Sequence, residues 1–92
     1  MSTVKKVILA DDTEYAGEAA TADAGRDLWV ELDSMDEQAL LAAFIKFRDP
    51  EATKEIKFYS LGEIRDTFDD YIKMVGFYDS GDGKVNIRMR KE

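Results

Sequence analysis

Residues 27–50 read DLWVELDSMDEQALLAAFIKFRDP, and this stretch decides the fold class. Residues 27–33 alternate between two kinds of side chain, which predicts a half-buried strand. One side of that strand carries Leu28, Val30 and Leu32, and the other carries Trp29 and Glu31. A strand of this kind must bury its apolar side against another element, and the residues that follow it supply one.

An amphipathic helix is predicted directly after the strand, over about residues 35–48. Ser34 and Glu37 have the spacing of a capping box, which marks the start of a helix. Apolar side chains at spacings of three and four form a stripe wide enough to cover a sheet: Leu40, Leu41, Phe44, Ile45 and Phe47. Asp49 precedes Pro50 and therefore ends the helix. Pro50 can open one further short turn with Asp49 as its cap.

The residues before this stretch predict a hairpin. Residues 4–10 and 14–20 form its strands, with Tyr15 directed inward, and residues 11–13 supply the turn. Residues 19–25 have little to bury and end in glycine, which favours a surface loop, with a short helix as the alternative.

The residues after the helix predict more strands. Residues 56–61 are rich in aromatic side chains and form a strand. Residues 64–78 fit both a helical spacing and the alternation of a bent strand, and we favour the strand because Gly62 and Gly76 interrupt the helical pattern. Residues 84–90 alternate clearly, with cations on the outer side, which suits an edge strand. Those cations could also meet acidic side chains across the sheet.

The sequence therefore predicts an α+β fold in a single domain over residues 1–92. Its sheet is antiparallel, has five or six strands and carries the helix (about 35–48) on one face. We expect a core formed by the apolar sides of these elements: Val30, Leu32, Leu40, Phe44, Ile56, Phe58, Ile87 and Met89.

The composition excludes several kinds of chemistry. The 92 residues include no cysteine and no histidine, which removes disulfides, thiolate nucleophiles, the commonest general base and the commonest metal ligand. The turn at residues 79–83 resembles a calcium loop, but Gly81, Gly83 and Arg90 stand where that loop needs oxygen ligands. We expect no catalytic residue, no metal site and no cofactor. A pair of carboxylates from distant positions remains an open basis for a small enzyme.

No apolar run approaches the length of a signal peptide or of a membrane-spanning helix. The longest run near the start covers only residues 7–10 before two aspartates. We therefore expect a cytoplasmic protein with no membrane partner.

The negative charge is concentrated in the first part of the chain. The formal net charge is −7, and residues 1–37 alone carry ten acids against three bases. Within residues 10–37 the only cation is Arg26. Such a stretch is either a solvated acidic face or a surface for a basic protein partner, and it disfavours direct binding to nucleic acid. The residues expected to bind a partner are Asp11, Asp12, Glu14, Glu18, Asp27, Trp29, Glu31 and Asp33. Trp29 is included in this set with the acidic residues because tryptophan is frequent among binding hot spots.

Several short segments resemble small uncharacterised proteins that prophages and mobile elements of Gram-positive gut bacteria carry. They are residues 7–15, 28–30, 47–53, 56–59, 68–71 and 83–89. Members often have glycine where this chain has Asp12 and Asp70. The resemblance implies no activity and no site residues, but it implies a phage-encoded protein that is present in the cytoplasm of the host.

In that context, the acidic stretch suggests a non-catalytic inhibitor of host defence. Such a protein would act as an anti-CRISPR or anti-restriction DNA mimic, occupying the basic nucleic-acid channel of a nuclease. A virion or tail accessory protein is the alternative, and the oligomeric state stays open.

Overall fold

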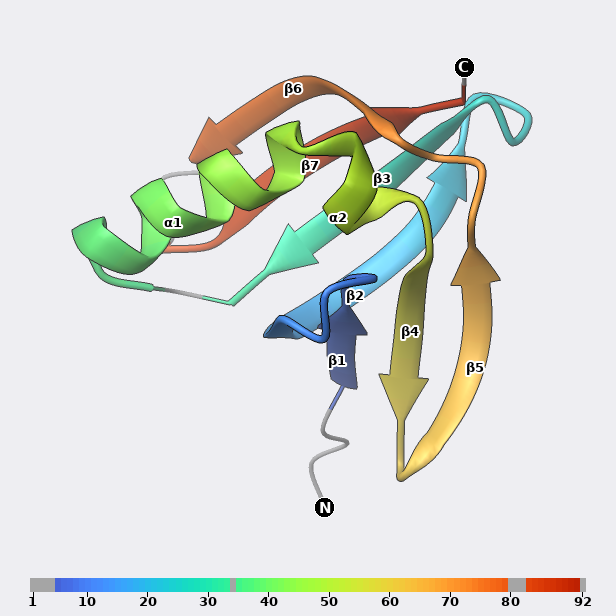
Figure 1. Cartoon of the computed structure of the whole chain (residues 1–92), viewed down its shortest axis with the longest axis horizontal. Helices are drawn as coiled ribbons and strands as arrows, with labels where there is room; N and C mark the ends of the chain where they lie inside the picture. Colours follow the sequence, from blue (N-terminus) through green and yellow to red (C-terminus); the bar gives the residue numbers. More distant parts are fainter. Residues whose placement is uncertain (1–4, 34, 80–82, 92) are drawn as a thin grey trace.

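Seven strands and two helices make up the part of the chain that the structure describes (Figure 1). The structure is a computed structural model and describes residues 5–33, 35–79 and 83–91. The strands are β1 (Lys5–Ile8), β2 (Glu14–Ala22), β3 (Asp27–Leu32), β4 (Ile56–Ser60), β5 (Glu63–Phe68), β6 (Lys73–Asp79) and β7 (Val85–Arg90). The helices are α1 (Glu37–Arg48) and α2 (Pro50–Thr53).

These strands form one antiparallel sheet in the order β5-β4-β1-β2-β3-β7-β6. β2 changes partner along its length, because its first three residues pair with β1 and its last six with β3. Gly17 stands at this change, opposite Leu32. A Cβ atom at Gly17 would lie 2.2 Å from the carbonyl oxygen of Glu31. Only glycine therefore lets β2 and β3 approach so closely, and this approach joins the two halves of the sheet.

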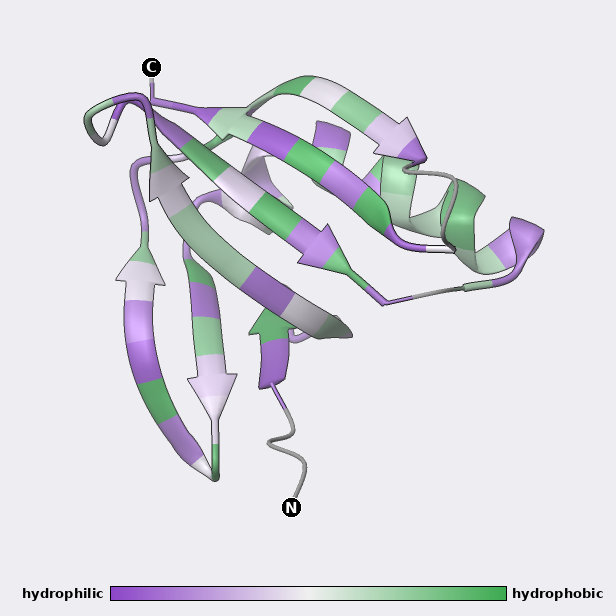
Figure 2. Ribbon diagram, turned by 180° about the vertical axis from the view of Figure 1, so that it is seen from behind, coloured by the Kyte–Doolittle hydropathy of each residue, from purple (hydrophilic) through white to green (hydrophobic). Residues whose placement is uncertain are grey.

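The hydrophobic core lies between α1 and one face of the β3-β7-β6 half of the sheet (Figure 1). Alternate residues of β3 and β7 face this core and are buried: Leu28, Val30, Leu32, Val85, Ile87 and Met89. The other elements and loops add Val7, Leu9, Ala43, Phe47, Ala52, Ile56 and Tyr71. Figure 2 shows the opposite face of the sheet in front and the helices behind it.

The edge strands, β5 and β6, each contain a β-bulge. The pairing of β5 with β4 skips Arg65, and the pairing of β6 with β7 skips Val75. A bulge interrupts the row of free backbone donors and acceptors along an edge, so it hinders pairing with a second sheet. The interpretation of residues 84–90 as an edge strand is wrong, because β7 lies between β3 and β6.

The predicted α+β class and antiparallel sheet are confirmed, but the number of strands is too low. The bent strand expected within residues 64–78 is two strands, β5 and β6. The chain turns between them just before Tyr71, which is buried and whose hydroxyl donates a hydrogen bond to the carbonyl oxygen of Gly25.

The end of the helix is confirmed, and its start is corrected. α1 begins at Glu37, and the side chain of Asp36 caps it by accepting a 2.7 Å hydrogen bond from the Ala39 amide. Ser34, the predicted cap, lies outside the described residues. Asp49 caps α2 through a 3.0 Å bond from the Glu51 amide, so the short turn opened by proline is confirmed. The described chain thus has two helices where one main helix was expected.

Two further predictions about local structure need correction. β2 continues to Ala22, although residues 19–25 were expected to be a loop, because pairing with β3 overrides the weak apolar pattern. The turn is confined to residues 23–26, where Asp23 and Ala24 adopt left-handed φ angles of 55° and 57°. The hairpin turn expected at residues 79–83 lies partly outside the described residues.

The expected core is partly correct. Val30, Leu32, Ile56, Ile87 and Met89 are buried, whereas Leu40, Phe44 and Phe58 are only partly buried. α1 is rotated about its axis relative to the expected orientation, because Ala43 and Phe47 point to the sheet. Leu40 and Phe44 lie to one side of these two residues and remain partly exposed to solvent.

Candidate functional site

The open face of the sheet is built from the residues of β3 and β7 that alternate with the core. Because side chains alternate along a strand, this face carries Asp27, Trp29, Glu31, Asn86, Arg88 and Arg90. Asp27 stands directly opposite Arg90, and Trp29 directly opposite Arg88. Figure 2 shows the same alternation as changes of colour along β3 and β7.

Asp27 is held by two arginines of β7. The Arg90 guanidinium donates from Nε to Oδ1 over 2.9 Å and from Nη2 to Oδ2 over 3.3 Å. Arg88 donates from Nε to Oδ2. The Asp27 side chain is 0% exposed beneath these groups. The Arg90 hydrogen bonds, followed by those of Arg88, lower the pKa of Asp27 from 3.8 to about 2.

Acid is expected to weaken the fold through Asp27. Because the pKa of Asp27 is lower in the folded chain than its ordinary value of 3.8, the stabilising contribution of the carboxylate is fully present above about pH 4. That contribution is lost as the pH falls toward about 2. Urea unfolding of the wild type and of Asp27→Asn, measured across this range, tests the expectation.

The variant should be less stable than the wild type at pH 7, and the difference should shrink in acid. Asp11→Asn is the matched control, because a hydrogen bond from Lys46 also lowers the pKa of Asp11 to about 2. Asp11 lies at an exposed turn, so Asp11→Asn should lower the stability at pH 7 by less than Asp27→Asn does. A difference between wild type and Asp27→Asn that stays constant from pH 7 to pH 2 would contradict this assignment.

Trp29, Arg88 and Tyr78 form a cluster beside this pair. The guanidinium carbon of Arg88 lies 5.2 Å from the centroid of the Trp29 ring, which is a cation–π geometry. The rings of Trp29 and Tyr78 lie 6.2 Å apart. A Cβ atom at Gly76 would lie 2.4 Å from the Tyr78 hydroxyl oxygen, so Tyr78 lies flat over Gly76. We call Trp29, Tyr78 and Arg88 the aromatic cluster.

The structure brings five of the eight predicted partner-binding residues together, four on the open face of the sheet and Asp33 beside them. Glu18 of β2 stands opposite Glu31 of β3, on the same face as Asp27 and Trp29. Asp33 follows β3 and lines a polar hollow with Glu18. Asp11, Asp12 and Glu14 lie instead at the turn between β1 and β2, away from the aromatic cluster.

Lysines lie next to four of the six exposed acids that were predicted to bind a partner. The four pairs have nitrogen–oxygen distances of 2.6–3.7 Å: Asp11 with Lys46, Glu14 with Lys6, Glu18 with Lys5, and Glu31 with Lys84. Arg26 is therefore not the only cation that offsets the charge of residues 10–37. The expectation that cations of residues 84–90 meet acidic side chains across the sheet is confirmed by Lys84 with Glu31 and by Arg88 and Arg90 with Asp27. Each exposed pair contributes little to stability, but together the pairs reduce the negative field.

Asp27 requires a correction as a partner-binding residue. Its carboxylate is fully covered by Arg88 and Arg90, so it cannot reach a partner. It contacts the Arg88 guanidinium, which lies over the Trp29 ring. Arg88 and Tyr78 were missed as candidates. The alternation of residues 84–90 placed Arg88 on an outer face, but only the strand order places it beside Trp29.

Within residues 5–33, 35–79 and 83–91, no group of three or more acidic side chains has an arrangement that could hold a metal ion. The same residues include no helix with both the length and the apolar character needed to cross a membrane.

Comparisons of the chain with protein-family models, with curated proteins and with solved structures find no match.

Proposed function

We propose that this chain is a non-catalytic protein-binding protein whose partner docks on the open face of the sheet at the aromatic cluster. The observation that carries the proposal is the placement of tryptophan, tyrosine and arginine side by side on an uncovered sheet face. These three residue types dominate binding hot spots, because they combine a large apolar area with a polar group. Tyr78 is 50% exposed, so half of its area is still available for burial.

A protein partner fits this face better than a nucleic acid does. Aromatic platforms for nucleic acids lie in positively charged grooves. Here the Asp27 carboxylate offsets one of the two positive charges of Arg88 and Arg90, and the acidic residues Glu18 and Glu31 lie on the other side of Trp29, so this face is not a positively charged groove. The net charge of −7 also opposes binding to phosphates. The partner is therefore a protein whose surface combines an apolar centre with basic side chains.

The more specific proposal of a DNA-mimicking inhibitor needs carboxylates that are free to imitate phosphates. Four of the exposed candidates lie beside lysines, so their charge is partly neutralised. We therefore propose protein binding as the function, with a host-defence nuclease or a virion component as the two classes of partner to be distinguished.

Capture of the partner and measurement of its affinity test the proposal. The immobilised chain is used to isolate proteins from a lysate of its source cells, and each captured protein is purified for binding measurements. Tyr78→Ala is expected to weaken the complex by at least about tenfold, as truncation of a hot-spot residue does. Tyr78 is an exposed side chain, so the fold should remain intact.

Leu61→Ala is the matched control for this test. Leu61 is also a large exposed apolar residue, but it lies in the turn between β4 and β5. Truncation of Leu61 to alanine should leave the affinity for the captured partner unchanged. Equal affinity of the wild type and Tyr78→Ala for every captured protein would overturn the proposed surface.

A further inference from the structure

The outer side of α1 carries an apolar stripe that the sheet leaves uncovered. Glu37, Leu41, Phe44, Ile45 and Arg48 follow one another at spacings of four, three, one and three, so they share one side of the helix. Leu41 and Ile45 are 61% and 60% exposed, which is far more than large aliphatic residues of a closed core show. The stripe is charged only at its two ends.

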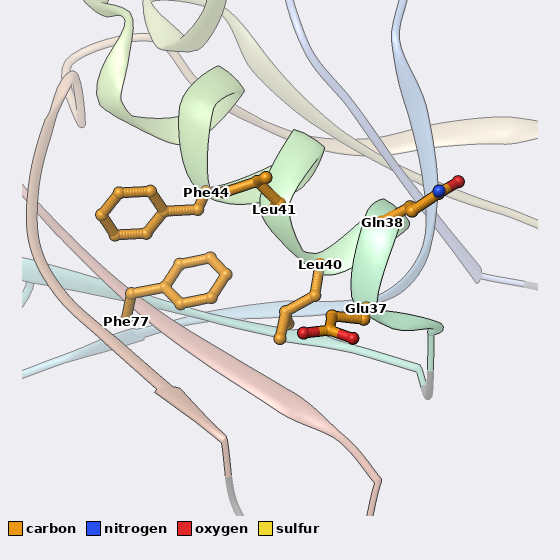
Figure 3. A pocket seen from close by; sticks show the side chains of 6 residues that line it. All are labelled: Glu37, Gln38, Leu40, Leu41, Phe44 and Phe77. Atoms are coloured by element: carbon orange, nitrogen blue, oxygen red, sulfur yellow. The ribbon is translucent and has the colours of Figure 1, made fainter.

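A groove runs along this stripe on the side toward β6 (Figure 3). Its volume is about 470 Å³, and it is lined by Glu37, Gln38, Leu40, Leu41, Phe44 and Phe77. Phe44 of α1 and Phe77 of β6 meet edge to face at 5.2 Å. The groove is thus an apolar hollow next to an apolar ridge on the same helix.

From this arrangement we propose that two copies of the chain associate through α1, with the two helices antiparallel across a two-fold axis. An axis between residues 42 and 43 places Leu41 opposite Phe44 of the second copy. Ile45 lies on the same flank of the stripe as Leu41, so the same axis brings Ile45 close to Leu41 of the second copy. A two-fold interface must be complementary to itself, and here the apolar centre of the stripe meets the same apolar centre of the second copy.

The charges of α1 favour a second copy over an unrelated partner. The same axis that pairs Leu41 with Phe44 brings Glu37 opposite Arg48 of the second copy, and Arg48 opposite its Glu37. These residues lie eleven positions apart, or about 16 Å along the helix, so both contacts form together at the two ends of the stripe. Although the whole chain is acidic, the stripe itself has one negative and one positive charge. It therefore avoids the self-repulsion expected of the rest of the surface.

The edge strands offer a poorer route to association. Their bulges at Arg65 and Val75 disrupt the hydrogen-bonding edge that a second sheet would need. A single helix of 12 residues buries less area than a standard stable interface. The dimer should therefore be weak, with a dissociation constant in the micromolar range or above.

Sedimentation velocity over a range from about 10 μM to about 1 mM tests the association. The wild type should change from monomer to dimer within this range. Ile45→Glu should have an association constant at least about tenfold lower than that of the wild type, because a carboxylate would be buried in the apolar interface. Ile64→Glu is the matched control, since Ile64 is exposed on edge strand β5. Its dimer should be as stable as that of the wild type.

Disulfide formation between single-cysteine variants tests the direction of the helices, because the chain has no cysteine of its own. Glu37→Cys and Arg48→Cys are mixed and oxidised. The antiparallel arrangement predicts a mixed disulfide between the two variants in excess over both homodimers. Cross-linking of Glu37→Cys to itself, a monomer at every concentration, or loss of the dimer in Ile64→Glu would each overturn the proposal. Because the aromatic cluster lies on the other face of the sheet, these outcomes do not depend on the proposed function.

Discussion

Replacement of Gly17 by alanine is expected to cost at least about 3 kcal/mol of the free energy of unfolding, the upper end of the usual cost of overpacking. The added Cβ atom would lie 2.2 Å from the carbonyl oxygen of Glu31 and 2.9 Å from the Cα atom of Leu32. Both are backbone atoms, so no side-chain rotation relieves the contact. β2 and β3 must separate where β2 changes partner, and urea unfolding followed by circular dichroism measures the loss.

Gly62→Ala separates the steric effect from the conformational one. Gly62 has a left-handed φ of 78°, but an added Cβ atom would meet nothing within 4 Å. It should cost only about 1 kcal/mol, the usual preference for glycine in this conformation. Equal losses for Gly17→Ala and Gly62→Ala would show that the close approach of β2 and β3 is not important for stability.

Phe47→Ala is expected to lower the free energy of unfolding by about 3–5 kcal/mol, as other truncations of buried aromatic residues do. The Phe47 side chain is fully buried, and its ring lies 5.6 Å from that of Tyr15 on β2. Its removal leaves a cavity between α1 and the strand that joins the two halves of the sheet. Thermal and urea unfolding both measure the effect.

Phe44→Ala is the comparison for this variant, one helical turn earlier. Phe44 is only partly buried, so its truncation should cost clearly less. Both variants are measured at low concentration to exclude any effect of association through α1. A larger loss for Phe44→Ala would mean that α1 is rotated relative to the sheet.

Much of the fold follows from local patterns in the sequence. The alternation in residues 27–33 and 84–90 correctly predicts two strands and the side of each that is buried, although residues 84–90 were expected at an edge of the sheet. Pro50 correctly predicts the end of α1. The start of α1 was misplaced because Ser34 and Asp36 are both good caps, and the sequence does not show which of them the chain uses.

The length of β2 and the number of strands depend on contacts between distant residues. Residues 19–22 are small and weakly apolar, and they are a strand because β3 pairs with them. Between β5 and β6 lies Tyr71, whose hydroxyl donates a hydrogen bond to the carbonyl oxygen of Gly25. Neither partner is close in sequence, so no local pattern reveals them.

The candidate site was predictable only in part, for the same reason. The alternation of residues 27–33 places Trp29 on the outer side of its strand, as the structure does. The arginines that cover Asp27 come from β7, and the strand order that brings β7 beside β3 is not evident from either strand alone. The same holds for the lysines that stand next to Glu14, Glu18 and Glu31.

The position of β3 between β2 and β7 has a consequence for how the chain folds during synthesis. β2 leaves the ribosome just before β3, but β7 is the last strand of the sheet and follows more than 50 residues later. At about 5–20 residues per second, one edge of β3 remains unpaired for several seconds. In that interval the nascent strand can pair with another chain. Slow translation or loss of residues 85–90 should therefore increase aggregation before the fold is complete, while the finished sheet, with its bulged edges, resists it.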